Sequence, residues 1–276
     1  GDDYINPGDN DYYDEIIAGA GTDIFDFSDI SDGYVHLHYW KLDAGISLDI
    51  DGTLNSGSVD KGINGFDTFL EISNALSSSR IGGVGVDGSS HNDEFSIQTD
   101  LGQWLQVKGG HGADTYSFSG DGTIRLDLHG GDQGVDVNLA SQIIVNDGYG
   151  NTETYTGELW EVRSTNHNDK IIGSALNESF ILLAGTDSLD GGDGFDLVRY
   201  DRNGVRDGID VNLGSGVATG QWSSVSFQHY LNNIEHVRGG SGDDLMVGDV
   251  RSNRLEGKGG HDRLYGGDGG DTIDGG

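Results

Sequence analysis

Apolar residues in the C-terminal part of the chain recur once in every nine positions, with polar residues and glycines between them. Four units follow one another from Gly239 to Asp274, and their eighth positions are Met246, Leu255, Leu264 and Ile273. A helix that packs on a core needs roughly three or four apolar residues in two turns, so this pattern does not predict helices. It predicts turns that alternate with short extended segments, which bury apolar side chains only if successive coils stack.

The same nine-residue phase recurs upstream of this region. Four units from Ser164 to Arg199 place Ile171, Phe180, Leu189 and Val198 at the eighth position, and shorter blocks lie at 9–26, 88–96 and 109–117. We therefore predict one continuous all-β solenoid over residues 1–276, a parallel β-roll with two units per coil. Its repeat blocks are expected at about 1–27, 88–118, 164–200 and 239–276, and its β-rich insertions at about 28–87, 119–163 and 201–238.

The insertions resemble one another. Each begins with an alternating segment, and these segments are Gly45–Ile50, Gly134–Leu139 and Gly208–Leu213. Each reaches a glutamate 26 or 27 residues later, namely Glu71, Glu161 and Glu235. Alternation of apolar and polar residues predicts strands, so the chain is expected to hold about three copies of one larger module. The only helix we expect lies around Phe66–Ala75.

The sixth position of the nine-residue unit carries a side chain with oxygen ligands. In the two long runs these residues are Asp169, Glu178, Asp187, Asp196, Asp244, Asn253, Asp262 and Asp271, and in the shorter blocks they are Asp14, Asp23, Asp93 and Asp114. An isolated Asp-Gly pair usually only caps a turn. Four consecutive units in phase favour metal binding, whereas for Asp14, Asp23 and Asp93 capping and metal binding are equally favoured.

The charge of the chain changes the interpretation of these acids. There are 15 basic and 47 acidic residues, so the net charge is 15 − 47 = −32. Such a chain repels nucleic acid and anionic membranes, and bound divalent cations are the simplest way to neutralise it. Cysteine is absent, which excludes disulfides and thiolate metal sites, and no apolar run is long enough to span a membrane.

Calcium fits the predicted turns better than other metals. It takes about six to eight oxygen ligands, and a glycine turn supplies carbonyl oxygens beside the carboxylate. Because alternate units share one edge of the coil, the expected pairs are Asp244 with Asp262, Asn253 with Asp271, Asp169 with Asp187, and Glu178 with Asp196. Magnesium demands stricter octahedral geometry, and zinc or copper would require histidine or thiolate ligands.

The units GGHGADTYS, GGDGFDLVR, GGSGDDLMV and GGDGGDTID resemble the nonapeptide GGxGxDxUx of RTX (repeats-in-toxin) proteins. The resemblance is specific over about 75 residues and looser elsewhere. It implies a calcium-binding parallel β-roll whose ligands are the sixth-position acids. It also implies a secreted or cell-surface protein of a Gram-negative bacterium, exported by type I machinery and folding where calcium is abundant. Asn253 and Glu178 depart from the family's aspartate.

No catalytic motif emerges from the sequence, since it contains neither HExxH nor GxSxG. His36 and His38 lie two residues apart, and we interpret them as part of a surface strand rather than a metal site. Trp40, Trp104, Trp160 and Trp222 suit either sugar stacking or cover for the coil. We therefore expect a non-enzymatic module that stiffens on binding calcium and serves as a spacer or adhesive segment of a longer protein.

Two alternatives stay open at this point. One is part of a secreted polysaccharide-modifying or lytic enzyme, with the insertions forming a cleft. The other is a filament or surface-layer subunit, because exposed strand edges favour end-to-end association. The expected partners are calcium and either extracellular polysaccharide or copies of the same chain.

Overall fold

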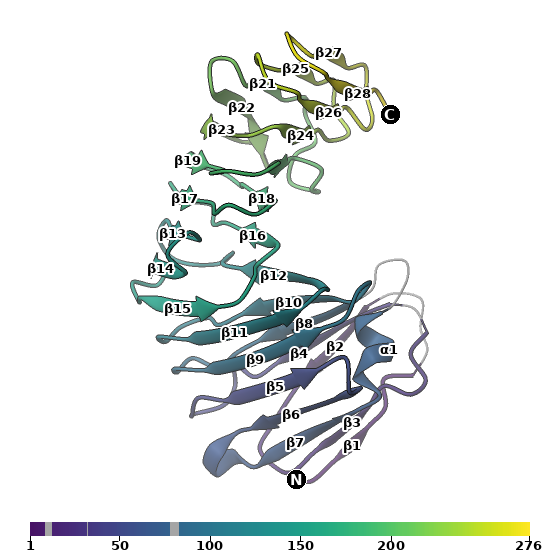
Figure 1. The fold of residues 1–276 in the computed structure, drawn as a ribbon. Coiled ribbons are helices and arrows are strands. Elements are labelled where there is room, and N and C mark those ends of the chain that lie inside the picture. Colours follow the sequence, from purple (N-terminus) through teal and green to yellow (C-terminus); the bar gives the residue numbers. More distant parts are fainter. Residues whose placement is uncertain (9–12, 32, 78–82) are drawn as a thin grey trace. The chain divides into compact units, whose positions relative to one another are not determined.

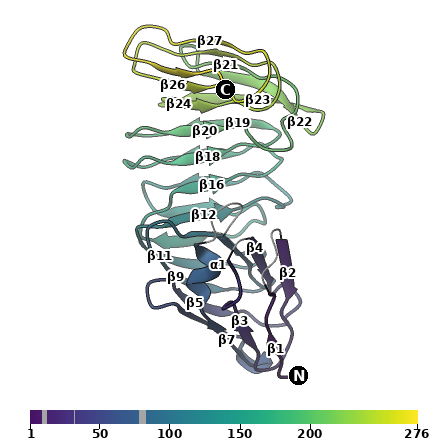
Figure 2. The ribbon, with the colours of Figure 1, turned by 90° about the vertical axis from the view of Figure 1, so that its right-hand side faces the viewer.

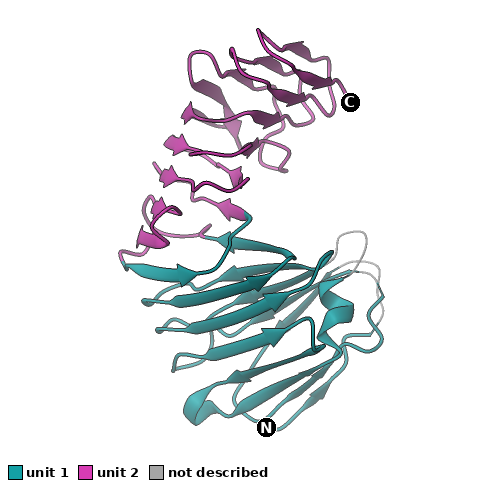
Figure 3. Ribbon diagram, in the orientation of Figure 1, with its two compact units in different colours: residues 1–127, 151–160 teal, residues 128–150, 161–276 magenta. Residues whose placement is uncertain are grey.

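The computed structural model describes residues 1–8, 13–31, 33–77 and 83–276. Among these residues the regular structure is almost entirely strand, with one short α-helix and one 3-10 turn. The chain forms two compact units (Figure 3), one of residues 1–127 and 151–160 and the other of residues 128–150 and 161–276. Each unit is built from long, mainly parallel sheets, which confirms the predicted all-β solenoid class.

The first unit contains two sheets (Figure 1). In spatial order, the strands of one sheet are β1 (Tyr4–Ile5), β3 (Ile24–Asp26), β7 (Phe66–Leu70), β6 (Ser56–Asp60), β5 (Ser47–Asp51), β9 (Glu94–Thr99), β11 (Thr115–Gly120) and β15 (Glu153–Thr156). The strands of the other are β2 (Tyr13–Ile17), β4 (Tyr34–His38), β8 (Gly83–Asp87), β10 (Trp104–Lys108) and β12 (Thr123–Asp127), all parallel.

Alternation along these strands explains the core of the first unit. In β9 the side chains of Phe95 and Ile97 are buried, whereas Glu94 and Ser96 are exposed. The Phe95 ring stacks on Tyr116 of β11, with 5.2 Å between the ring centroids. Side chains in a strand alternate between its two faces, so one face of each strand supplies the core.

The helix expected around Phe66–Ala75 is only partly present. Residues 66–70 form β7, because the buried Asp67 and Phe69 alternate with exposed or half-buried neighbours, as in a half-buried strand. Glu71 then adopts a left-handed conformation, with φ 56°, and the helix α1 (Ile72–Leu76) follows it. Its buried residues Ile72, Ala75 and Leu76 pack on the core.

The second unit also contains two sheets, which Figure 2 shows from the side. In spatial order, the strands of one sheet are β14 (Ile143–Asn146), β13 (Asp136–Asn138), β17 (Lys170–Ile172), β19 (Thr186–Asp190), β23 (Val225–Asn232), β22 (Val217–Trp222), β21 (Asp210–Asn212), β25 (Leu245–Val247) and β27 (Arg263–Tyr265). The other sheet is parallel and consists of β16 (Glu161–Arg163), β18 (Ser179–Ile181), β20 (Leu197–Arg199), β24 (His236–Arg238), β26 (Arg254–Glu256) and β28 (Thr272–Asp274).

The register of the second unit confirms two nine-residue units per coil. Met246 pairs with Leu264, and Leu255 pairs with Ile273, so residues 18 positions apart lie side by side. Ile171 and Leu189 are paired in the same way in the upstream run. Two units of nine residues return the chain to the same edge, so eighth-position side chains stack. Met246 and Leu255 are buried in the core, whereas Ile273 in the last coil is exposed.

The three insertions share one structural plan, as their sequences predicted. The alternating segments form β5, β13 and β21, and each is followed by an antiparallel excursion, namely β6 and β7, β14, or β22 and β23. A side chain on Gly45, Gly134 or Gly208 would collide with the backbone oxygen of Asn92, Asn168 or Asp243, respectively. Each of these oxygens belongs to the residue immediately before a sixth-position acid, so the three glycines are structurally equivalent.

Candidate metal centre

The sixth-position acids of the two long runs lie at the turns between strands, and four of them accept a hydrogen bond from the sixth-position residue of the coil before. The backbone N–H of Asp244 donates a hydrogen bond to Asp262 Oδ1, with 2.9 Å between nitrogen and oxygen. The other predicted pairs make the same bond at 2.8–3.0 Å, namely Asn253 to Asp271, Asp169 to Asp187 and Glu178 to Asp196. In the first unit, Asp93 donates to Asp114 Oδ1 at 2.8 Å. The structure thus brings together each pair that the 18-residue spacing predicted.

The glycines of each turn make room for this arrangement. At the first position, a side chain on Gly191 or Gly257 would collide with Oδ2 of Asp196 or Asp262, respectively. At the fourth position, Gly194 has φ 130°, and a side chain there would collide with the backbone oxygen of Leu176 in the preceding coil. The turn therefore requires glycine where the carboxylate folds back and where the chain adopts a left-handed conformation.

Some of the acids act as backbone caps. Asp244 accepts hydrogen bonds from the N–H of Ile209 at 2.9 Å and of Gly240 at 3.0 Å, one on each oxygen. Asp93 and Asp169 make the equivalent pairs of bonds at the start of their blocks. These three acids therefore have the geometry of turn caps, although they are buried rather than solvated.

Asp196 and Asp262 differ from these caps. Their Oδ1 atoms accept a backbone N–H, but Oδ2 is buried and has no hydrogen-bond partner among the residues that the structure describes. Burial raises the pKa of Asp196 to about 7. A buried carboxylate oxygen without a partner is costly unless it is protonated or meets a cation. These two turns therefore have a carboxylate oxygen and neighbouring backbone oxygens of the kind that calcium uses.

At Asp187 a histidine lies beside the second carboxylate oxygen, although neither of the two facing atoms has a hydrogen-bond partner among the described residues. His229 Nε2 lies 3.2 Å from Asp187 Oδ2, and His229 Nδ1 lies 3.1 Å from the Tyr200 hydroxyl. Burial raises the pKa of Asp187 to about 8 and lowers the pKa of His229 to about 3. All three side chains are 0% exposed, so no substrate reaches them in this conformation. The sequence did not indicate this group, because 42 residues separate Asp187 from His229.

At Asp23 the structure supplies a cation from the chain itself. The ammonium of Lys61 is fully buried and lies 3.1 Å from Asp23 Oδ2 and 2.8 Å from the backbone oxygen of Gly19. It also donates a hydrogen bond to Asp67 Oδ1. Two carboxylates and a backbone oxygen surround one positive charge, which is the kind of donor set that a calcium ion would meet.

The sequence contains a signal for this second acid, although Asp67 is not among the predicted ligands. The segment GINGFDTFL, residues 62–70, has glycine at its fourth position, Asp67 at its sixth and Phe69 at its eighth. Gly65 has φ 113°, as expected of a fourth-position glycine. Lys61 comes immediately before this unit, so the unit and its neutralising charge are adjacent in the sequence.

Three other predicted ligands depart from the aspartate turn. Asp14 lies inside β2, in register with the buried Val35, rather than in a turn. Glu178 accepts hydrogen bonds from the backbone and hydroxyl of Ser174 in its own unit. Asn253 accepts the N–H of Asp249 at 2.7 Å, whereas its Nδ2 is buried without a hydrogen-bond partner among the described residues.

Comparisons with known proteins do not assign the chain to a family. Within the described ranges, no helix has the length and apolar character needed to cross a membrane. No protein-family model matches the chain, and no curated protein matches its sequence.

Proposed function

We propose that the aspartate turns bind calcium ions and that the chain is a calcium-dependent β-roll region of a secreted bacterial protein, similar to RTX repeats. The observation that carries the proposal is the pair of buried Oδ2 atoms at Asp196 and Asp262, which have no hydrogen-bond partner among the described residues. Each folds over a first-position glycine at the edge of a coil. Because the repeat continues through Asp271, the equivalent turn at Asp271 is a further candidate calcium site.

The electrostatics of the turns support the same proposal. Burial raises the pKa of Asp93 and Asp244 to about 6, and those of Asp169 and Glu178 are also raised by burial. Burial in the stacked coils therefore favours the protonated form of these acids, whereas a bound divalent ion would favour the ionised form. At Asp67, burial raises the pKa to about 6, and the Lys61 ammonium opposes this shift without a metal.

Calcium is favoured over other ions by the chemistry of the donors. Asp196 and Asp262 offer hard carboxylate oxygens, and the glycine turns around them add backbone oxygens. Imidazole and thiolate, which zinc and copper prefer, do not belong to this repeating donor set. Flexible coordination numbers suit a turn that repeats with variations such as Asn253, and magnesium tolerates such variation poorly.

In this proposal, calcium couples binding to folding. A chain with net charge −32 stays expanded while its carboxylates are ionised and unpaired. Ions that bind the stacked coils but not the unfolded chain stabilise the fold by mass action. The chain would then remain open where calcium is scarce and stiffen outside the cell, in keeping with a spacer or adhesive role.

Calcium titration followed by circular dichroism tests the proposal. We expect strand signal to appear cooperatively as calcium is added, and equimolar magnesium to produce little of it. Asp262→Ala should reduce the apparent affinity by about 10-fold, because affinity at such sites depends on the number of charged ligands. Equilibrium dialysis should also show fewer calcium ions per chain.

Asp210→Ala is the matched control. Asp210 is an exposed acid of β21 and lies outside the turns that are proposed to bind calcium. This variant should titrate like the wild type. The proposal fails if Asp262→Ala also leaves the affinity and the number of bound ions unchanged, or if the strand signal is complete in calcium-depleted buffer at pH 8.

A further inference from the structure

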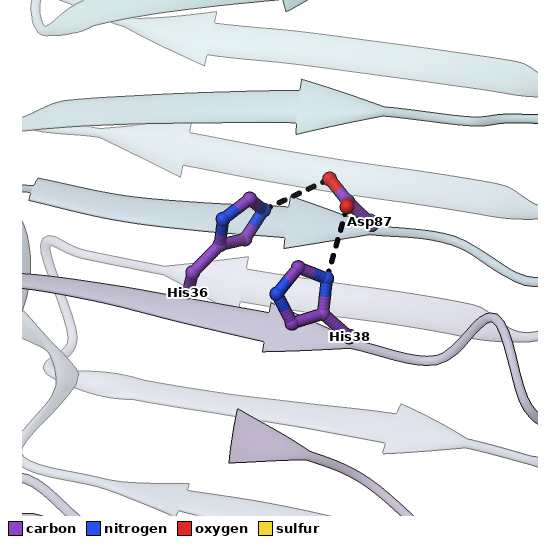
Figure 4. Close-up of side chains that lie close together, drawn as sticks. All are labelled: His36, His38 and Asp87. Carbon is purple, nitrogen blue, oxygen red and sulfur yellow. Dashed lines mark hydrogen bonds and ion pairs between the residues drawn. The ribbon is translucent and has the colours of Figure 1, made fainter. Parts of the chain in front are cut away.

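His36, His38 and Asp87 form a compact group on the first unit (Figure 4). His36 Nε2 lies 2.9 Å from Asp87 Oδ1, and His38 Nδ1 lies 2.9 Å from Asp87 Oδ2. One ligand atom from each residue can be chosen so that all three lie within 4.8 Å of one another. No other such trio of histidine and acid side chains occurs in the described parts of the chain.

We propose that this group binds one divalent transition-metal ion of the zinc type, in a site distinct from the calcium turns. Two imidazoles and one carboxylate are a common protein ligand set for zinc, with a water in the fourth position. Because imidazole is a poor ligand for calcium, this group and the aspartate turns select different ions.

The register of the sheet creates the site. His36 and His38 are two residues apart in β4, so both project from the same face. In the parallel neighbour β8, Asp87 pairs with His38 and Gly85 pairs with His36. A side chain on Gly85 would collide with the Tyr34 hydroxyl and crowd the ring of His36. The glycine therefore lets both rings lie over β8, where His36 reaches Asp87.

The outer ring nitrogens, which do not face Asp87, have polar neighbours that could support metal binding. His36 Nδ1 lies 3.1 Å from the Tyr13 hydroxyl, and His38 Nε2 lies 3.3 Å from Glu15 Oε1. Metal-binding histidines usually direct the second nitrogen toward a carboxylate, hydroxyl or carbonyl, which holds the ring and increases its basicity. Both neighbours come from β2, so three adjacent strands contribute to one site.

The site is partly accessible, as an ion-binding site must be. The side chains of His36, His38 and Asp87 are 14%, 9% and 22% exposed, respectively. Without a metal, each imidazole can donate a hydrogen bond to Asp87. An ion would take the place of these two ring protons, and each neutral ring would then carry its proton on the outer nitrogen. Only a ring nitrogen without a proton binds the ion, so binding should weaken at low pH.

Zinc titration of the full chain without a polyhistidine tag tests the inference. The titration is done by calorimetry at saturating calcium, so that the aspartate turns are occupied or irrelevant. We expect one zinc ion per chain. Cobalt(II) at the same site should give visible absorption bands typical of four-coordinate nitrogen and oxygen ligation.

Two variants and one control show whether zinc binds at this group. His38→Ala should weaken zinc binding by more than about 100-fold, since loss of even a supporting partner costs about 10- to 100-fold. Glu15→Gln should weaken it by about 10-fold, and this side chain is 54% exposed, so the variant is expected to fold. His261→Ala removes an exposed histidine of the second unit and should bind zinc like the wild type.

The inference is overturned if the wild type binds no zinc under these conditions, or if both His38→Ala and Glu15→Gln retain wild-type affinity. Zinc binding that disappears as calcium is raised would also overturn it, because the ion would then occupy the aspartate turns. Failure here leaves the calcium proposal untouched, since the two experiments change different residues and different ions.

Discussion

The Lys61 ammonium lies 3.1 Å from Asp23 Oδ2 in the interior of the first unit, where both side chains are almost completely buried. In the second unit, Asp262 occupies the equivalent position of its repeat, and its Oδ2 has no hydrogen-bond partner among the described residues. The same type of turn thus occurs with a cation from the chain and without one. In the calcium proposal, an ion at the Asp262 turn would supply the charge that Lys61 supplies at the Asp23 turn.

Lys61→Met should destabilise the first unit whatever the calcium concentration. The change leaves Asp23 and Asp67 buried without their cation, and breaking a buried ion pair from one side costs about 3–5 kcal/mol. Denaturant unfolding at saturating calcium measures the loss. Lys41→Met, at an exposed position, serves as the control and should stay within about 0.5 kcal/mol of the wild type. Equal stability of the Lys61 variant and the wild type would refute this role.

In calcium-depleted buffer, the stability of the second unit should fall as pH rises from 6.5 to 8. Burial raises the pKa of Asp187 to about 8 and that of Asp196 to about 7, whereas an unfolded aspartate has a pKa of about 3.9. In this window the folded chain binds more protons than the unfolded chain, so the slope of stability against pH is negative. Because the chain is expected to be largely open without calcium, the folded fraction at the two pH values, followed by circular dichroism, measures this slope.

The histidines do not reverse this slope within the chosen window. The pKa values of His229 and His236 are lowered by burial to about 3 and about 4, so they destabilise the fold mainly below pH 6.5. Asp196→Asn should flatten the slope, because it removes one of the two groups that titrate there. A stability that rises between pH 6.5 and 8 without calcium would contradict the assignment. With calcium present, protons compete with the ion, so calcium affinity should increase over the same window.

Gly194→Ala should destabilise the second unit more than Gly214→Ala. Gly194 has φ 130° and faces the backbone oxygen of Leu176, so alanine brings both strain and a collision. A strained backbone position of this kind costs roughly 1–3 kcal/mol. At Gly214 the nearest atom to an added methyl is Asn212 Oδ1 at 3.3 Å, and we expect a change within about 0.5 kcal/mol. Thermal unfolding in calcium compares the two, and equal effects would show that the turn tolerates other conformations.

Glu256→Gln should weaken the parallel sheet of the second unit. Glu256 is 2% exposed and lies 2.8 Å from both Arg238 Nε and Lys258 Nζ and 2.7 Å from Arg254 Nη2. Because these partners are partly exposed, we expect a loss of about 2 kcal/mol, below that of a fully buried pair. Denaturant unfolding of this variant and of Asp210→Asn, an exposed acid in β21, gives the comparison, and the Asp210 variant should match the wild type.

Much of the fold could be predicted because the sequence pattern that specifies it is periodic and local. The nine-residue repeat places an apolar residue two positions after each acid, and stacking such units pairs Met246 with Leu264 and Asp244 with Asp262. The three alternating segments likewise predicted β5, β13 and β21. Asp14 lies within β2 rather than in a turn, because the two-residue spacing of Asp14 and Ile16 also places both on one face of a strand.

The sequence by itself determined the repeat, the strand positions and the spacing between paired acids, because these follow from local backbone geometry repeated along the chain. Only the tertiary structure decided which acids keep an oxygen without a partner. Lys61 reaches Asp23 from 38 residues away, His229 reaches Asp187 from 42, and Asp87 reaches His38 from 49. Such partners are brought together by the stacking of whole coils, and no local period specifies which side chain the next coil will supply.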